Sequence, residues 1–275
     1  MVKASSISQP EKPLIALTIA GFDPSSGAGV TADRMVFAAH NIYGLAAITA
    51  LTVQSTQGVR RVQPVSAEIL RETLDCLAED AEIGGIKIGM LATAENVEVV
   101  SIFLSRFRIS PGKVVLDPIL RSSSGHELLS EEGLKSLKSD LLPLVGWVTP
   151  NTDELAILAG MPVSDREAVP EAATRLAADH PGLNLIVTGG HLDPPDDYLR
   201  TADGAEQWFP GQRIRTTATH GTGCAFSSAL LARLLAADPP AQAVSAAKAY
   251  VMEAMKAAKP IGKGRGPLHH LYRPL

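Results

Sequence analysis

The 275-residue chain contains little cysteine and few aromatic side chains: Cys76 and Cys224 are its two cysteines, and aromatic residues make up 4% of the composition. Two distant cysteines cannot form a disulfide framework and favour a reducing compartment. No apolar run reaches membrane-spanning length, and a net charge of −4 without a polybasic tract argues against binding to nucleic acid or membrane surfaces. Residues 1–13 lack the apolar segment of a secretory signal. We therefore expect a soluble, cytoplasmic protein.

Several familiar site motifs are also missing. The chain has neither the G-x-G-x-x-G dinucleotide fingerprint nor a Walker A sequence. Its late histidines, His191, His220, His269 and His270, do not have the spacing of zinc ligands. His220 is expected to pack a loop. A nicotinamide-dependent dehydrogenase and a structural zinc site are thereby disfavoured.

What is present is an alternation of short apolar runs with amphipathic segments, which predicts a mostly parallel sheet flanked by helices in one α/β domain. We expect residues 1–13 to form a flexible tail and residues 14–275 to form the domain. Predicted strands cover 14–20, 43–53, 83–89, 113–117, 146–149 and 183–188, with a hairpin at 198–202 and 206–210. Predicted helices cover 30–40, 66–80, 95–107, 130–142, 151–159, 167–179, 241–258 and a segment that begins near 222. Cys76 falls in the second of these helices and is expected to be a core residue.

The stretch Thr219-His220-Gly221-Thr222-Gly223-Cys224 leads directly into an Ala/Leu-rich helix. Glycines let backbone N–H groups converge, and a helix N-terminus adds partial positive charge, so the stretch can bind an anion such as phosphate. The same field would favour the thiolate form of Cys224. Taken alone, the stretch fits a tight turn with a buried cysteine equally well.

Other polar and glycine-rich segments also follow predicted strands. Because the carboxyl ends of parallel strands share one edge of a sheet, we expect these segments to line a single crevice. They are residues 21–29, 54–58, Met90, Asp117, 151–154, 189–191 and 221–224.

Asn151 and Glu154 open one of the predicted helices, and two interpretations apply to them. An N-cap Asn with Glu three residues later is a capping box. A carboxylate at this place could also hold Mg²⁺ beside nucleotide phosphates. Asp117 has a similar pair of interpretations, as a metal or phosphate-site acid or as the acceptor that closes a turn before Pro118.

The chain resembles the hydroxymethylpyrimidine/phosphomethylpyrimidine kinases of thiamine biosynthesis over about residues 14–270. The resemblance rests on motifs that occur in the family's order. They are TIAGFDPSSGAG at 18–29, ITALTVQSTQG at 48–58, KIGM at 87–90, LDP at 116–118, TPNTDE at 149–154, GGH at 189–191, THGTGC at 219–224 and GPLHH at 266–270.

This resemblance implies a ribokinase-like fold, commonly dimeric, and transfer of phosphate from ATP with Mg²⁺ to 4-amino-5-hydroxymethyl-2-methylpyrimidine and then to its monophosphate. Residue roles follow by position. The pyrimidine site is assigned to Gly21, Asp33, Gln54 and Met90, with Gln54 bonding the aminopyrimidine. The anion hole is assigned to Gly221, Thr222 and Gly223, and the base facing the substrate hydroxymethyl group to Cys224. Asn151 and Glu154 match the Mg²⁺/phosphate motif of the family. We expect Asn151, Thr188 and Gly190 to bind ATP, and Glu154 and Asp117 to hold Mg²⁺.

Two positions depart from the family pattern. Thr188 stands where many members have a lysine before Gly-Gly-His, and Ser123 stands where some have a second lysine. Arg121, Lys263 and Arg265 are candidates for the missing positive charge. Two other functions therefore stay open: a pyridoxal/pyridoxine kinase, whose substrate has a similar ring, and a non-catalytic vitamin-binding relative.

Overall fold

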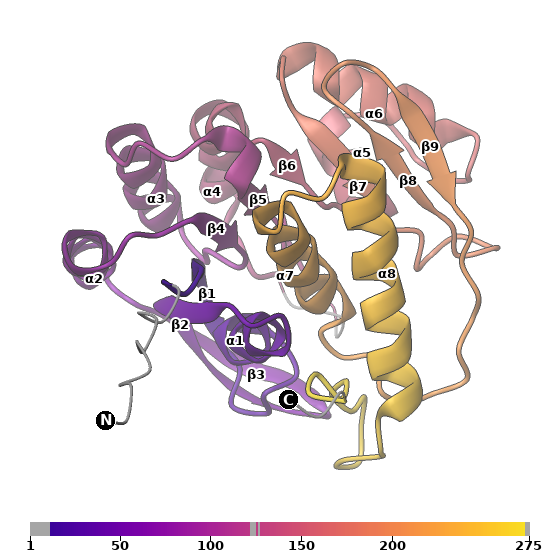
Figure 1. Cartoon of the computed structure of the whole chain (residues 1–275), viewed down its shortest axis with the longest axis horizontal. Coiled ribbons are helices and arrows are strands. Elements are labelled where there is room, and N and C mark those ends of the chain that lie inside the picture. The colour runs from indigo at the N-terminus through magenta and orange to yellow at the C-terminus, as the bar shows by residue number, and fades with distance from the viewer. Residues whose placement is uncertain (1–11, 122–124, 126, 273–275) are drawn as a thin grey trace, which may run out of the picture.

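A computed structural model describes residues 12–121, 125 and 127–272. The proposed flexible tail at 1–13 lies almost wholly outside these residues, as does Ser123. Nine strands form one sheet in the order β3-β2-β1-β4-β5-β6-β7-β8-β9 (Figure 1). The six strands from β2 to β7 in this order run parallel, and β3, β8 and β9 are antiparallel to their neighbours. The predicted α/β class and mostly parallel sheet are confirmed.

The strands are short and lie at or near the predicted positions. Their bounds are β1 Ile15–Phe22, β2 Tyr43–Ser55, β3 Gly58–Pro64, β4 Gly85–Ile88, β5 Val114–Leu116, β6 Trp147–Val148, β7 Asn184–Val187, β8 Asp197–Arg200 and β9 Glu206–Phe209. The predicted hairpin is formed by β8 and β9.

The helices also follow the predicted segments. They are α1 Gly29–Ala39, α2 Ala67–Asp80, α3 Ala94–Arg106, α4 Glu131–Ser136, α5 Thr152–Ala159, α6 Ala168–Asp179, α7 Thr222–Leu235 and α8 Pro240–Ala257. The predicted helix over 130–142 is only in part an α-helix, because after α4 the chain continues as a π turn and a 3₁₀ turn to Leu144.

Each central strand packs against a helical layer on both faces. In β1, Leu17 and Ile19 join the core that includes residues of α2 to α6, whereas Ala16 joins the core that includes residues of α1, α7 and α8. Successive side chains of a strand point to opposite faces, so an all-apolar strand is the expected pattern for a sheet covered on both sides. The same alternation directs Thr18 of β1 toward Asp33 of α1.

Strand β3 was missed because it lies at the edge of the sheet. Its sequence, GVRRVQP, is mostly polar; Val59 is buried, and both arginines are exposed. An edge strand with one solvated face does not give the continuous apolar signal of a central strand. β2 and β3 form a hairpin, so the polar stretch at 54–58 ends β2, makes the tight turn Thr56–Gln57 and begins β3, with Ser55 paired to Gly58.

One local prediction is wrong. Cys76 is exposed, because helical geometry places it about 200° around α2 from buried Leu74. The glycine-rich end of the chain packs against the start of α7: Gly266, Pro267, Leu268 and His270 are buried, and the backbone N–H of His220 donates to the carbonyl of Gly266.

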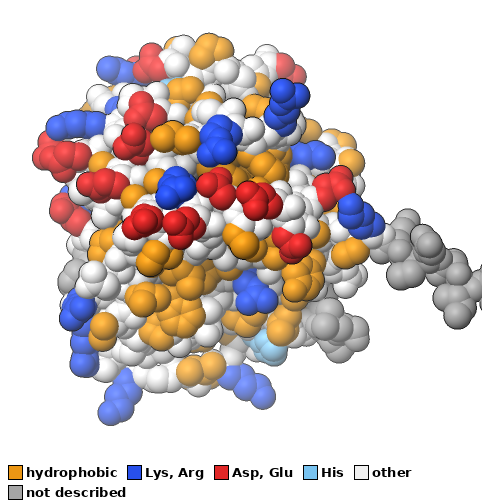
Figure 2. Space-filling model, turned by 90° about the vertical axis from the view of Figure 1, so that its left-hand side faces the viewer, with side chains coloured by type: hydrophobic (Ala, Val, Ile, Leu, Met, Phe, Trp, Pro, Cys, Tyr) orange, Lys and Arg blue, Asp and Glu red, His pale blue; other side chains and the backbone are white. Residues whose placement is uncertain are grey.

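On the side of α2 and α3, the described surface has no large basic face. Figure 2 shows acidic and basic side chains interspersed there, with apolar groups between them. Among the helices of the described residues, none is both long and apolar enough to cross a bilayer.

Candidate active site

The segments predicted to line one crevice lie at the carboxyl ends of the parallel strands. Because β2, β1, β4, β5, β6 and β7 are all parallel, the segments that follow them emerge at the same edge of the sheet. The start of α7 joins them there. A Cβ built at Gly221 would lie 1.8 Å from the Gly27 carbonyl oxygen, and one built at Gly223 would lie 3.7 Å from Asp117 Oδ2.

The socket at Gly221 to Cys224 is built from two glycine-containing segments that touch. Gly221 is the N-cap of α7 and has φ +83°, a left-handed conformation that favours glycine. The Asp23 carboxylate holds the facing loop by accepting hydrogen bonds from the backbone N–H groups of Gly27 and Ala28. In the first turn of α7, backbone N–H groups have no partner within the helix. They can bind an anion at this point.

A buried polar cluster lies directly beneath the socket. Asp117, at the end of β5, accepts a hydrogen bond from Ser227 Oγ at 3.2 Å and another from the Cys224 thiol. Burial raises the pKa of Asp117 to about 6, although Lys87 opposes that rise. The structure thus brings together three predicted site residues, Gly223, Cys224 and Asp117.

Lys87 is the part of this cluster that the sequence did not predict. It projects from β4 and is fully buried, and its Nζ donates to Asp33 Oδ2 at 2.9 Å. Burial alone would lower the pKa of Lys87, but the charges of Asp33, Cys224 and Asp117 raise it above its ordinary value. A lysine between Ile86 and Ile88 in a strand covered on both faces was the available signal, since a buried charge requires a partner.

Asp33 does not reach the surface of the protein. Its side chain is fully buried, and its carboxylate accepts hydrogen bonds from Thr18 Oγ1 at 2.6 Å, Lys87 Nζ at 2.9 Å and Ser228 Oγ at 2.8 Å. These contacts join α1, β1, β4 and α7. The structure therefore gives Asp33 a position behind the site, not on its exposed wall.

The thiol of Cys224 does not behave as the helix N-terminus suggested. Burial raises its pKa to about 12; Lys87 opposes the rise, and Asp117 and Asp33 add to it. The expectation that the helix field would lower this pKa is wrong, because the loss of hydration is the larger effect.

Asn151 and Glu154 form the capping box. Asn151 Oδ1 accepts from the Glu154 N–H at 2.9 Å, and Glu154 Oε2 accepts from the Asn151 N–H at 3.0 Å. Burial and the nearby negative charge of Asp117 nevertheless raise the pKa of Glu154 to about 8. A cation bound beside this buried carboxyl group would favour its ionised form, so Glu154 is suited to hold one.

Gln54 and His220 meet on the other side of the socket. The carboxamide of Gln54 lies 3.0 Å from His220 Nε2, and the same imidazole nitrogen lies 2.7 Å from Asp23 Oδ2. The expected packing role of His220 agrees with its contact with Gly27, where an added Cβ would lie 2.2 Å from the ring. His220 also joins two predicted site segments through hydrogen bonds.

Gly21 and Met90 are adjacent, as the resemblance implied. A Cβ at Gly21 would lie 2.7 Å from Met90 Cε. Met90 is buried with Ala50 and Leu128, and Thr49 Oγ1 donates to its carbonyl oxygen. The two residues therefore lie together beside Ala50 of β2, the strand that carries Gln54.

The Thr188 region is more open. Thr188 is half-buried and pairs with Asn151 across a single parallel bridge, and Gly190 is exposed with open space around it. Arg121 forms an exposed ion pair with Glu127. The segment that carries Lys263 and Arg265 packs elsewhere, on the turn after β2, where the Gly264 N–H donates to Thr56 Oγ1.

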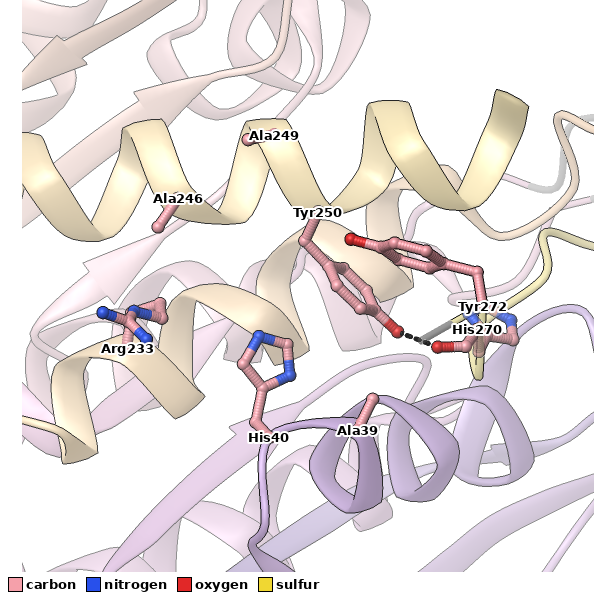
Figure 3. A pocket seen from close by; sticks show the side chains of 8 residues that line it. All are labelled: Ala39, His40, Arg233, Ala246, Ala249, Tyr250, His270 and Tyr272. Atoms are coloured by element: carbon pink, nitrogen blue, oxygen red, sulfur yellow. Dashed lines mark hydrogen bonds between the residues drawn. The ribbon is translucent and has the colours of Figure 1, made fainter. Parts of the chain in front are cut away.

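A separate cavity of about 300 Å³ lies between α1, α7, α8 and the end of the described chain (Figure 3). None of the predicted site residues lines it. Its lining residues are Ala39, His40, Arg233, Ala246, Ala249, Tyr250, His270 and Tyr272. The candidate active site is thus the group of segments at the sheet edge, distinct from this cavity.

Comparison with known proteins identifies the family of the chain. The phosphomethylpyrimidine kinase family model matches residues 23–269. The chain belongs to the phosphomethylpyrimidine kinase family. It is 41% identical over 252 residues to a hydroxymethylpyrimidine/phosphomethylpyrimidine kinase of Aquifex aeolicus, covering 91% of this chain and 98% of that one.

Solved structures in this family and its neighbours have the same ribokinase-like fold. A phosphomethylpyrimidine kinase of Clostridium difficile superposes with a TM-score of 0.77 at 30% identity, covering 88% of this chain and 99% of that chain. The pyridoxal kinase of Staphylococcus aureus in complex with ADP gives a TM-score of 0.86 at 27% identity, with 95% of both chains covered. The fold that the resemblance implied is confirmed.

Proposed function

We propose that this chain uses ATP to phosphorylate 4-amino-5-hydroxymethyl-2-methylpyrimidine and then its monophosphate, as a step of thiamine biosynthesis. The observation that carries the proposal is the socket at Gly221 to Cys224, set over Asp117 and Lys87 in a chain of the phosphomethylpyrimidine kinase family. The kinase names of the relatives and the ADP complex of the S. aureus neighbour support it.

Phosphoryl transfer depends mainly on alignment and on neutralising developing charge. The free N–H groups at Gly221, Thr222 and Gly223 would bind the oxygens of the transferring phosphoryl group. Gly21, Gln54 and Met90 would hold the pyrimidine ring, with Asp33 supporting the site from behind. Asn151, Thr188 and Gly190 would contact the nucleotide.

Cys224 would accept the proton of the substrate hydroxyl as part of a relay. Its thiol donates to Asp117, whose pKa of about 6 leaves the carboxylate ionised at neutral pH. As the substrate hydroxyl gives its proton to Cys224 Sγ, the thiol proton would pass to Asp117. This route needs no free thiolate beforehand, which agrees with the raised pKa of Cys224.

Glu154 and Asp117 are the proposed Mg²⁺ ligands, Asp117 through a water molecule, so that its carboxylate could still take the thiol proton. Their donor set fits the ion, since both are buried carboxyl groups with raised pKa values that interact with each other. No cluster of three or more His, Cys, Asp or Glu suited to a metal occurs among the described residues, so the remaining ligands would be water and phosphate oxygens. When bound, Mg²⁺ would neutralise charge on the nucleotide phosphates.

We place the enzyme in the cytoplasm as a homodimer. The described structure has both cysteines free, which suits a reducing compartment. Tyr43, Leu51 and Val53 are exposed along β2 and supply an apolar surface for self-association. Light scattering coupled to gel filtration tests the dimer.

A pyridoxal kinase is the second candidate, favoured by the close superposition on the S. aureus enzyme. A coupled ADP-release assay with the hydroxymethylpyrimidine, its monophosphate and pyridoxal separates the two functions. We expect turnover with the first two substrates, each dependent on Mg²⁺. Turnover with pyridoxal alone would contradict the proposed function.

A further inference from the structure

The neighbours of His220 allow a single protonation state at its Nε2 atom. Asp23 Oδ2 lies 2.7 Å away. Burial raises the pKa of Asp23, but hydrogen bonds from His220 and Ser25 outweigh this, so its pKa is below the ordinary value and the carboxylate is ionised. An ionised carboxylate only accepts hydrogen bonds, so Nε2 of His220 must carry a proton and donate it.

This proton fixes the orientation of the Gln54 amide. The Gln54 amide nitrogen lies 3.0 Å from this Nε2, and two N–H donors cannot bond each other. The amide is therefore turned by 180°, so that its carbonyl oxygen shares the Nε2 proton with Asp23. At the other end, Thr52 Oγ1 lies 3.1 Å from the amide and donates its single proton to the Phe22 carbonyl at 3.0 Å. In the turned amide the nitrogen faces Thr52 Oγ1, which accepts from it because the hydroxyl proton is donated to Phe22, so both contacts agree with this orientation of Gln54.

The imidazole is held firmly enough to impose that orientation. The His220 side chain is 14% exposed, and its ring packs against Gly27, where even a methyl group would not fit. Its backbone N–H donates to the Gly266 carbonyl at 3.1 Å. Asp23 is held in turn by Ser25, whose Oγ donates to Oδ1 at 2.7 Å.

We propose that His220, with Asp23 and Thr52, is a positioning residue that determines which ring the enzyme accepts, by fixing the Gln54 amide in one orientation. The fixed amide retains one free N–H and one free carbonyl lone pair. This pair matches a ring nitrogen acceptor next to an amino donor, the pattern with which glutamine also binds adenine. The inference rests on the proposed function in one respect, that Gln54 faces the substrate ring.

A ring with the opposite pattern tests the inference. In the 4-oxo analogue of the pyrimidine, an N–H and a carbonyl replace the ring acceptor and the amino donor, so the fixed amide should reject it, whereas an amide free to turn would bind both. For the native enzyme we expect kcat/KM for the amino substrate to exceed that for the oxo analogue by on the order of a hundredfold or more.

The substitution His220→Phe keeps an aromatic ring at this position but removes the ring N–H. His220→Phe should lower the amino-to-oxo ratio of kcat/KM by about tenfold or more, with the KM for ATP within about twofold of native. His220→Gln restores an N–H near the Nε2 position and should recover most of the ratio. If His220→Phe lowered kcat/KM equally for both rings, the role would be structural and the inference wrong.

Two further measurements test the inference without a change at position 220. Thr52→Val removes the partner of the amide nitrogen and should lower the same ratio without touching position 220. Long-range ¹H–¹⁵N NMR of the native chain should show a protonated Nε2 at His220. An unprotonated Nε2 would overturn the inference, whatever the enzyme phosphorylates. A protonated Nε2 without pyrimidine turnover would instead contradict the proposed function and leave the fixed amide in place.

Discussion

Lys87 Nζ and Asp33 Oδ2 form an ion pair at 2.9 Å between two side chains that are both fully buried. The pair connects β4 to α1 beneath the socket at the start of α7, and Ser228 of α7 donates to the same carboxylate. Buried charges are stable only when they are paired and hydrogen-bonded. This ion pair therefore fixes the position of the elements that form the site.

Removing one partner should be costly. Lys87→Met leaves the Asp33 carboxylate buried without its cation, and we expect a loss of about 3–5 kcal/mol in the free energy of unfolding. Urea denaturation measures this loss. The double variant with Asp33→Asn should regain part of it, because neither charge remains buried. A single variant as stable as the native chain would show that the pair does not hold the fold.

The position of this pair illustrates what the sequence could and could not predict. All-apolar β1 and the motif at Gly221 to Cys224 indicated a covered sheet and a site at its carboxyl edge. They could not indicate which polar side chains would be buried, since Asp33 and Lys87 lie 54 residues apart and meet only in the folded chain. The contact between His220 and Asp23 spans 197 residues and was unpredictable for the same reason.

The Cys224 pKa is a clearer case of tertiary structure outweighing local sequence. A helix N-terminus lowers the pKa of a thiol by a fixed local field, and this effect can be read from the motif. Burial and neighbouring carboxylates raise the pKa, and both depend on how α7 packs on β4 and β5. Strand β3 was missed for a different reason, because an edge strand carries a weak apolar signal.

Replacing Cys224 should affect chemistry more than nucleotide binding. Cys224→Ala removes the proposed proton acceptor, and general-base contributions are typically about 10²–10⁴-fold in rate. We expect kcat to fall within this range, with little change in the KM for ATP. Cys76→Ala is the matched control, since that cysteine is exposed on α2 and should leave kcat unchanged. Near-normal turnover by the Cys224 variant would reject the base assignment.

The raised pKa of Glu154 predicts how stability depends on pH in metal-free buffer. An unfolded glutamate ionises near 4.5, whereas the buried side chain keeps its proton up to about pH 8. Its contribution to stability is therefore complete below about pH 4.5 and is lost as the pH rises toward 8. Between pH 5 and 9, the unfolding free energy of the native chain should fall relative to that of Glu154→Gln by a few kcal/mol.

Glu154→Gln is a suitable reference, because glutamine can keep the capping box and has no charge to lose. Unfolding is followed by urea denaturation at each pH in the presence of a chelator. Parallel curves for the two proteins would mean that Glu154 is already ionised at neutral pH. Adding Mg²⁺ with a non-hydrolysable nucleotide should stabilise the native chain more than the variant, if Glu154 is a ligand.

Thr188 supplies no positive charge to the nucleotide. The strand order shows which of the three basic candidates lies nearest to Thr188, which follows β7. Lys263 and Arg265 lie beside the turn after β2, five strands from β7, which is about 24 Å at the usual strand spacing. Arg121 follows β5, two strands from β7, or about 10 Å away. Arg121 is therefore the better placed of the three to reach phosphates bound near Thr188.

We expect Arg121→Gln to raise the KM for ATP several-fold and the double variant Lys263→Gln/Arg265→Gln to leave it unchanged. Thr188→Lys should lower the KM for ATP, and more so in the Arg121→Gln background, because one cation then replaces the other. Steady-state kinetics with ATP as the varied substrate measures all four proteins. Equal effects of the Arg121 variant and the double variant would show that the charges act through the general field of the protein, without a specific contact to the nucleotide.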